Sequence, residues 1–194
     1  MEPTDVARLA QSILDTHHAY LHREMAPLTN ALRGAPVDIR QHWAELAQVL
    51  EDHLMKEEVI LFPSIQALAG GDQSTAMHVM GPIPQMKVDH ANIRRLEAQL
   101  RADVPRAGAA GAALTALLDD LAEHARKEDE ELFPAALALL PGTPDLEAID
   151  AAAEAQIAQE SAARAAPRRP DPSPAKPARR GIGERVLGRL FGKG

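Results

Sequence analysis

Two stretches of the chain place a glutamate four residues after a histidine. They read HLMKEEVILFP at residues 53–63 and HARKEDEELFP at residues 124–134, and they agree at six of eleven positions. Because a step of four along an α-helix returns to within about 40° of its start, each histidine lies on one face with its glutamate. Imidazole and carboxylate groups are ligands for iron, zinc, copper and nickel. The repeat therefore predicts two pairs of metal ligands.

These two pairs, His53 with Glu57 and His124 with Glu128, interrupt apolar stripes. Leucines precede each histidine at helical spacing, so both pairs are expected to point inwards. Glu58 lies about 140° round from His53 and should face elsewhere. A buried glutamate without a partner costs several kcal/mol or takes up a proton, and an enclosed metal ion would supply the counter-charge. The alternative is solvated charge on a surface helix, but it does not explain why the leucines recur with the ligand-type residues.

A pair of metal ions needs further ligands, and two other helical segments offer them. His18 continues an apolar stripe between Leu14 and Leu21, and His90 has the equivalent place on another segment. Four histidines in terminal positions and two bridging glutamates would hold two ions between facing helices. The predicted metal ligands are His18, His53, Glu57, His90, His124 and Glu128.

The other histidines carry weaker signals. His17 is about 100° from His18 and is expected to support a ligand or to face solvent. His22, His42 and His78 are treated as ordinary core or surface residues, although His22 shares a face with His18.

Breaker residues divide the chain into helices joined by modest connections. Ala and Leu supply most of the apolar content, and only 3% of residues are aromatic, which favours helix over strand. We expect an all-α protein: an antiparallel four-helix bundle over residues 1–140, followed by an Ala-rich fifth helix at 141–166. The expected bundle helices run from Thr4 to Arg33-Gly34, from Asp38 to an end or kink at Pro63, from GPIP at 81–84 to Pro105, and from Ala107 to Pro134 or just beyond.

The composition excludes several classes of protein. Cysteine is absent, so disulfides, a thiolate nucleophile and a cysteine-bound iron–sulfur cluster are excluded. The net charge of −7 argues against nucleic-acid binding. The start, MEPTDVARLA, has no apolar signal core, and no run of about 20 apolar residues exists. A cytoplasmic location is the expectation.

The charge is divided between an acidic body and a basic end. Residues 1–140 hold 12 Lys and Arg against 21 Asp and Glu, a balance of −9, whereas residues 164–194 hold 9 against 2, a balance of +7. Residues 167–180 read as a Pro- and Arg-rich linker and residues 181–194 as a basic amphipathic tail. We expect residues 179–194 to lie on an anionic membrane surface, such as the inner membrane, or in a protein groove; the alternative is a disordered solubilising end.

Four motifs resemble a known family. HHAYLHRE, HLMKEEVILFP, VDH and HARKEDEELFP are similar to the hemerythrin-like, or HHE cation-binding, domain over about residues 4–140. MGPIPQMKVDH at 80–90 resembles the bacterial branch that repairs iron–sulfur clusters. The resemblance implies a non-haem di-iron centre with an oxo or hydroxo bridge, held by the six side chains named above. This chain departs from that branch in two ways. The branch usually begins with a cysteine-bearing domain, and this sequence has no cysteine. Some relatives also carry a further histidine near the end of the first helix, a region that reads LTNALRGAPV here and contains none.

The resemblance implies two functions. One is a di-iron protein of the nitrosative and oxidative stress response, acting in iron–sulfur cluster repair or NO handling, with damaged iron–sulfur proteins as partners. The alternative is a reversible carrier or sensor of O₂ or NO that signals through its C-terminal tail. No general base or nucleophile beyond the metal is visible, so whether the protein is an enzyme stays open at the level of the sequence.

Overall fold

The structure, a computed structural model, describes residues 1–142 and 146–165. Over those residues the chain forms helices and turns and contains no strand. In chain order the α-helices are α1 (Pro3–Ile13), α2 (Ala19–Ala31), α3 (Val37–Lys56), α4 (Phe62–Ala69), α5 (Ala76–Met80), α6 (Pro82–Asp103), α7 (Gly111–Lys127), α8 (Phe133–Leu137) and α9 (Leu146–Ala165). Short π-helical turns join some of them: η1 (Leu14–His18), η3 (Glu57–Leu61) and η7 (Glu128–Leu132). The 3₁₀ turns are η2 (Leu32–Gly34), η4 (Gln73–Thr75), η5 (Val104–Arg106) and η6 (Gly108–Ala110).

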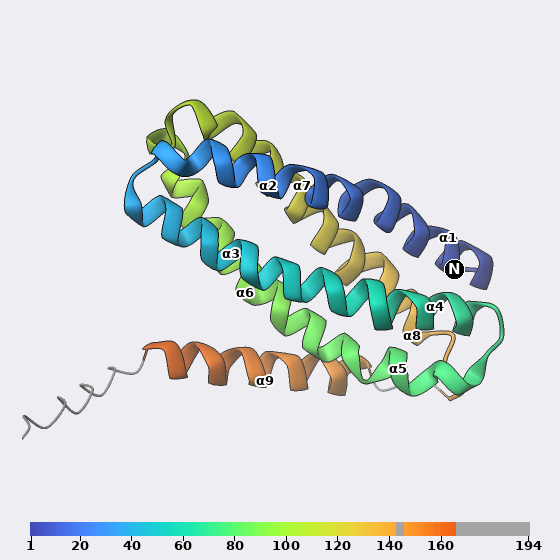
Figure 1. Ribbon diagram of the computed structural model, residues 1–194. Coiled ribbons are helices and arrows are strands. Elements are labelled where there is room, and N and C mark those ends of the chain that lie inside the picture. Colours follow the sequence, from blue (N-terminus) through green and yellow to red (C-terminus); the bar gives the residue numbers. More distant parts are fainter. Residues whose placement is uncertain (143–145, 166–194) are drawn as a thin grey trace, which may run out of the picture.

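These helices combine into four antiparallel rods (Figure 1). The first rod is α1–η1–α2, the second is α3–η3–α4, the third is α6, and the fourth is α7–η7–α8. The second rod packs against the third through α3 and α6 and against the first through α1 and α4, while α2 contacts α7. The predicted four-helix bundle is therefore confirmed.

Two apolar clusters fill the bundle, one towards each end. The first cluster includes Leu21, Leu32, Trp43, Leu50, Leu96, Leu114 and Leu121. The second cluster includes Val6, Ile13, Phe62, Ile65, Ile83, Leu132 and Phe133. Each rod carries one or two of the six predicted ligands, and these lie where the first cluster ends and the second begins. Apolar side chains therefore enclose the polar centre on both sides.

The second rod does not end at Pro63. The chain leaves α3 at Lys56, makes the π-helical turn η3 and enters α4, where Pro63 stands in the first helical turn. Proline is tolerated in a first turn because the missing N–H has no helical partner there. Pro134 has the same position in α8. The expected loop at residues 70–75 contains a real turn at Gly71, whose φ of 98° favours glycine, but Gln73–Thr75 forms η4.

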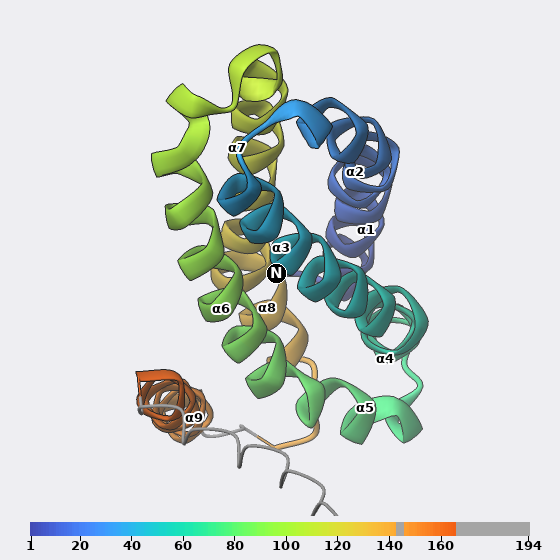
Figure 2. The ribbon, with the colours of Figure 1, turned by 60° about the vertical axis from the view of Figure 1, so that its left-hand side comes forward.

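The extra C-terminal helix is also confirmed, because α9 runs beside α6 outside the four rods (Figure 2). Ala153 is buried in this contact, and Gln156 Nε2 donates to Gln85 Oε1 over 3.1 Å. None of the helices described here has the length and apolar character needed to cross a bilayer. The expected linker and basic tail, residues 167–194, lie outside the described residues, so the division into four regions stays a prediction.

Candidate metal centre

The structure brings all six side chains of the predicted site into one buried cluster. His18 ends η1, His90 lies on α6, and the two pairs from the repeated motif come from the second and fourth rods. Glu57 and Glu128 are the first residues of η3 and η7. Each of the six residues is at most 2% exposed. The six residues thus lie on the inner faces of the four rods, and their role as metal ligands stays a prediction.

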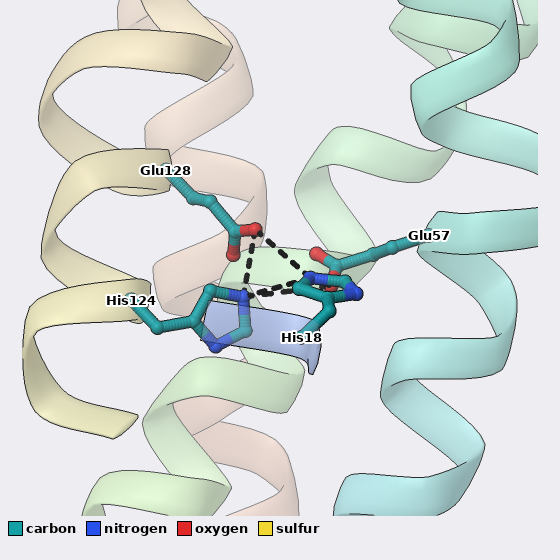
Figure 3. Close-up of side chains that lie close together, drawn as sticks. All are labelled: His18, Glu57, His124 and Glu128. Atoms are coloured by element: carbon teal, nitrogen blue, oxygen red, sulfur yellow. Dashed lines mark hydrogen bonds and ion pairs between the residues drawn. The ribbon is translucent and has the colours of Figure 1, made fainter. Parts of the chain in front are cut away.

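The six side chains form two overlapping groups. The His18/His124 group contains those two histidines with Glu57 and Glu128, and Figure 3 shows these four side chains. The His53/His90 group contains the other two histidines with the same two glutamates. Within each group the potential ligand atoms lie within 4.8 Å of one another. Two adjacent sites that share two carboxylates suit a pair of metal ions.

In the His18/His124 group the nitrogen atoms face the carboxylates. The two Nε2 atoms are 3.2 Å apart. His124 Nε2 lies 2.8 Å from Glu128 Oε1, and His18 Nε2 lies 3.5 Å from Glu57 Oε2. The dashed lines in Figure 3 include the contacts of His124 with His18 and Glu128 and the 3.8 Å contact between His18 and Glu128.

The His53/His90 group repeats this arrangement. Its two Nε2 atoms are also 3.2 Å apart. His53 Nε2 lies 3.3 Å from Glu57 Oε2, and His90 Nε2 lies 3.1 Å from Glu128 Oε2. Each glutamate thus contacts a histidine of both groups.

Several atoms of this centre are buried without a hydrogen bond. Both oxygens of Glu57 and Oε2 of Glu128 are in this state. A buried carboxylate without a donor is strongly unfavourable in a protein interior. A bound cation would satisfy these oxygens and the imidazole lone pairs at once. The residues present therefore fit a pair of metal ions of the kind that accepts mixed nitrogen and oxygen ligands.

Outer carboxylates orient two of the four imidazoles. His18 Nδ1 lies 2.9 Å from Glu58 Oε1, and His90 Nδ1 lies 2.9 Å from Asp129 Oδ1. An ionised carboxylate only accepts, so each Nδ1–H donates and Nε2 is the ring nitrogen that faces the centre. His53 Nδ1 is farther from its carboxylate, at 3.8 Å from Asp89 Oδ2.

His124 is supported differently. Its Nδ1 atom is buried without a hydrogen bond. Its ring instead stacks on His17, with 6.0 Å between centroids and 19° between planes. His17 is held by Asp120 Oδ1 at 2.9 Å and by Lys127 Nζ at 3.1 Å. Because ammonium only donates, His17 Nε2 accepts from Lys127 and its Nδ1–H donates to Asp120.

Burial and neighbouring charges separate the pKa values of the histidines. Burial lowers the pKa of His53 to about 4 and also lowers the pKa of His124. For His90, burial acts in the same direction, but the hydrogen bond to Asp129 and the neighbouring Glu128 carboxylate outweigh it and raise the pKa to about 9. Without metal, His90 therefore holds a proton that a metal ion must displace.

Each π-helical turn includes a residue of the candidate site. His18 ends η1, while Glu57 and Glu128 begin η3 and η7. Such turns carry an i→i+5 pattern and are frequent at functional sites. The repeated Leu-Phe-Pro segment then packs beneath the imidazoles. The Phe62 ring lies 5.2 Å from His18, and the Phe133 ring stacks on His90 at 5.9 Å.

Sequence reasoning pointed to His17 as a possible support of a ligand, and His17 does stack on His124, but it missed the carboxylates around the centre. Glu58 was expected to face elsewhere, but its Oε1 atom is shared by His18 and His22, the latter at 2.7 Å. Asp89 directly precedes His90, and Asp129 directly follows Glu128. This adjacency is the only sign in the sequence that either aspartate supports the centre. The rotation of 100° per residue shows which side chains share a face of one helix. It does not reveal contacts between side chains of different rods. His42 lies apart from the centre and pairs with Asp103 at 2.7 Å.

Residues 9–136 match the hemerythrin HHE cation binding domain, which is more than half of the chain. The chain belongs to this family. The resemblance seen in its motifs is thereby confirmed, and the matched residues span the four rods of the bundle. As an HHE cation-binding protein it is expected to bind cations, and its buried histidine and glutamate groups provide a place for them.

Curated relatives of this HHE protein are iron–sulfur cluster repair proteins named YtfE. The protein of Escherichia coli O157:H7 is 29% identical over 154 residues, which cover 69% of this chain and 67% of the relative. Those of Edwardsiella ictaluri and Citrobacter koseri are 34% and 32% identical, over 54% of this chain and 49% and 50% of the relatives. The chain thus spans about half to two thirds of their length. No solved structure gives a significant match.

Proposed function

We propose that the six buried side chains hold two iron ions. His18 and His124 would bind one ion, His53 and His90 the other, and Glu57 and Glu128 would bridge them. The observation that carries this assignment is the set of buried glutamate oxygens without a hydrogen bond, facing the Nε2 atoms of four histidines. Membership of a cation-binding family supports it.

The protein's own residues set the environment of this centre. Two bound iron ions would supply redox chemistry and positions for a small ligand such as O₂ or NO. Apolar residues of both core clusters exclude water from the centre. Glu58 and Asp129 hold His18 and His90 in the orientation that presents Nε2. Acid and base chemistry by other buried side chains is not needed for these roles.

The proposed cellular function is repair of iron–sulfur clusters or handling of NO under nitrosative and oxidative stress. The support is the similarity to proteins named for iron–sulfur cluster repair. On this proposal, the partners are proteins whose iron–sulfur clusters have been oxidised or nitrosylated.

A repair assay tests the proposal. A nitrosylated or oxidised iron–sulfur enzyme is incubated with the wild type, with His124→Ala, and with His42→Ala as a control at a histidine remote from the centre. We expect recovery of enzyme activity with the wild type and the control but not with His124→Ala. Equal recovery with all three proteins would remove this function.

A second candidate is a reversible carrier or sensor of O₂ or NO. It is supported by the centre itself, because two adjacent metal positions enclosed by both apolar clusters could bind a small gas, and a shared fold does not fix the activity. Optical titration of the iron-loaded protein with O₂ and NO, followed by removal of the gas, distinguishes the two. A carrier returns the gas intact and regains its starting spectrum, whereas consumption of the gas argues for the repair and NO-handling function.

A further inference from the structure

The two metal-binding groups differ in how the protein supports their imidazoles. In metal sites, a carboxylate that accepts from the outer nitrogen of a histidine raises the basicity of the ligating nitrogen and fixes the ring. Loss of such a partner typically costs 10–100-fold in metal affinity. The contacts of each histidine Nδ1 atom should therefore affect the affinity of its group for a metal ion.

In the His53/His90 group each histidine faces a carboxylate that is itself paired with a cation. His90 Nδ1 contacts Asp129 Oδ1 at 2.9 Å, and Arg94 contacts the other oxygen of Asp129 at 3.0 Å. His53 Nδ1 makes no hydrogen bond, but the Asp89 carboxylate lies beside it, 3.8 Å away.

Asp89 is fixed more firmly still by its other neighbours. Lys56 Nζ donates to Oδ2 at 2.9 Å, and Gln85 Nε2 donates to Oδ1 at 2.9 Å. Gln156 of α9 donates in turn to Gln85, so the outermost helix extends this network. Little freedom is left for these carboxylates to move.

The His18/His124 group has weaker support. Glu58 uses one oxygen for both His18 and His22, so the two imidazoles share a single acceptor. His124 Nδ1 lacks a hydrogen bond, as His53 Nδ1 does, but unlike His53 Nδ1 it faces no carboxylate among the described residues. The outer partner of His18 is also more exposed: the side chain of Glu58 is 32% exposed, against 21% for Asp129 and 15% for Asp89, and that of His22 is 53% exposed.

We infer that the two bound ions are inequivalent, and that the His18/His124 group holds the exchangeable one. The His53/His90 group retains its ion. Glu58 is the positioning residue of the exchangeable position, and it and His22 link that position to solvent. This inference rests on the proposed di-iron centre and adds to it which ion is available to other molecules.

Release of iron from the full-length, Fe(II)-loaded protein tests the inference. A chromophoric iron chelator is added in excess without oxygen, and iron transfer is followed with time. We expect two phases of about one ion per chain each. Glu58→Ala should accelerate the fast phase by about 10-fold or more and leave the slow phase unchanged. Asp129→Ala should accelerate the slow phase instead.

Matched controls separate a local effect from loss of surface charge. Glu45→Ala and Asp119→Ala remove exposed carboxylates that pair with arginines away from the centre, and both should release iron as the wild type does. If Asp129→Ala fails to fold, Arg94→Gln loosens the same carboxylate while retaining it, and it should also accelerate the slow phase.

Release of both ions in one phase, or an effect of Glu58→Ala confined to the slow phase, would overturn the inference and leave the di-iron centre standing. Binding of fewer than two ions by the wild type would instead contradict the proposed centre, and the inference would fail with it. Metal analysis of the loaded protein before the chelator is added separates these results.

Discussion

Glu57 and Glu128 reach the same buried centre from two different rods, yet their carboxyl groups have opposite pKa shifts. Burial and the neighbouring Glu128 charge raise the pKa of Glu57 well above its usual range. Burial would also raise the pKa of Glu128, but His124 and the other imidazoles around it lower it well below that range. Without metal, Glu57 therefore holds a proton more tightly than Glu128 does.

Replacement of Glu57 tests whether this position serves binding at the expense of stability. Glu57→Gln removes a buried acid that the metal-free protein accommodates poorly. We expect the free energy of unfolding of the metal-free protein to rise by roughly 1–3 kcal/mol, while the bound iron falls to one ion per chain or fewer. Urea denaturation and metal analysis of the same preparation measure both effects. Lower stability together with full metal content would contradict this assignment.

The stability of the metal-free protein should depend on pH through His90. Its pKa is raised from 6.5 to about 9 in the folded protein, so the stabilisation is fully present below pH 6.5 and is lost as pH rises through 9. We expect a loss of at most about 3 kcal/mol across this range. Denaturant unfolding at a series of pH values measures it. His90→Gln should remove this part of the pH dependence, and an unchanged slope in that variant would assign it elsewhere.

Each ligand histidine should matter far more for metal binding than a histidine outside the centre. His124→Ala removes one of the two imidazoles of its group, so we expect at least a 10-fold loss of affinity for one ion. His42→Ala, which removes a partner of Asp103, should bind both ions normally. Calorimetric titration of the metal-free proteins with Fe(II) under anaerobic conditions compares them. Equal affinities for both variants would argue against His124 as a ligand.

The phenylalanines of the repeated motif should affect the centre as well as the core. Phe133 is fully buried and stacks on His90, so Phe133→Leu should cost about 1–2 kcal/mol of stability and also weaken metal binding. Leu114→Ala is the control. It removes a buried side chain from the first cluster, should cost about 2–5 kcal/mol, and should leave the affinity of the folded protein for metal unchanged. Parallel thermal unfolding and metal titration distinguish the two.

The sequence was most informative where helical rotation alone decides which residues share a face. The step of four between His53 and Glu57, and the apolar stripe through His18, were enough to place these side chains inside a bundle. Contacts between rods could not be read in this way. Rotation about its own helix predicts that Glu58 faces away from the centre. It cannot show that His18 and His22 of the first rod reach this carboxylate.

The π-helical turns were also beyond sequence reasoning. Periodicity of 3.6 residues treats each rod as a regular helix, so it predicts an end or kink at Pro63. The π-helical turn η3 instead carries the chain to α4 with Pro63 in its first turn. This path places the Phe62 ring against His18 of the first rod, a contact that periodicity within one rod does not reveal.

Metal analysis with a visible spectrum, on protein purified from iron-replete cells, tests the central assignment most directly. We expect about two iron ions per chain and an absorption band of a non-haem iron centre. Both should disappear in a Glu57→Gln, Glu128→Gln double variant that still folds as a helical bundle. A wild-type protein with less than one metal ion per chain, or with the same iron content as the folded double variant, would contradict the assignment.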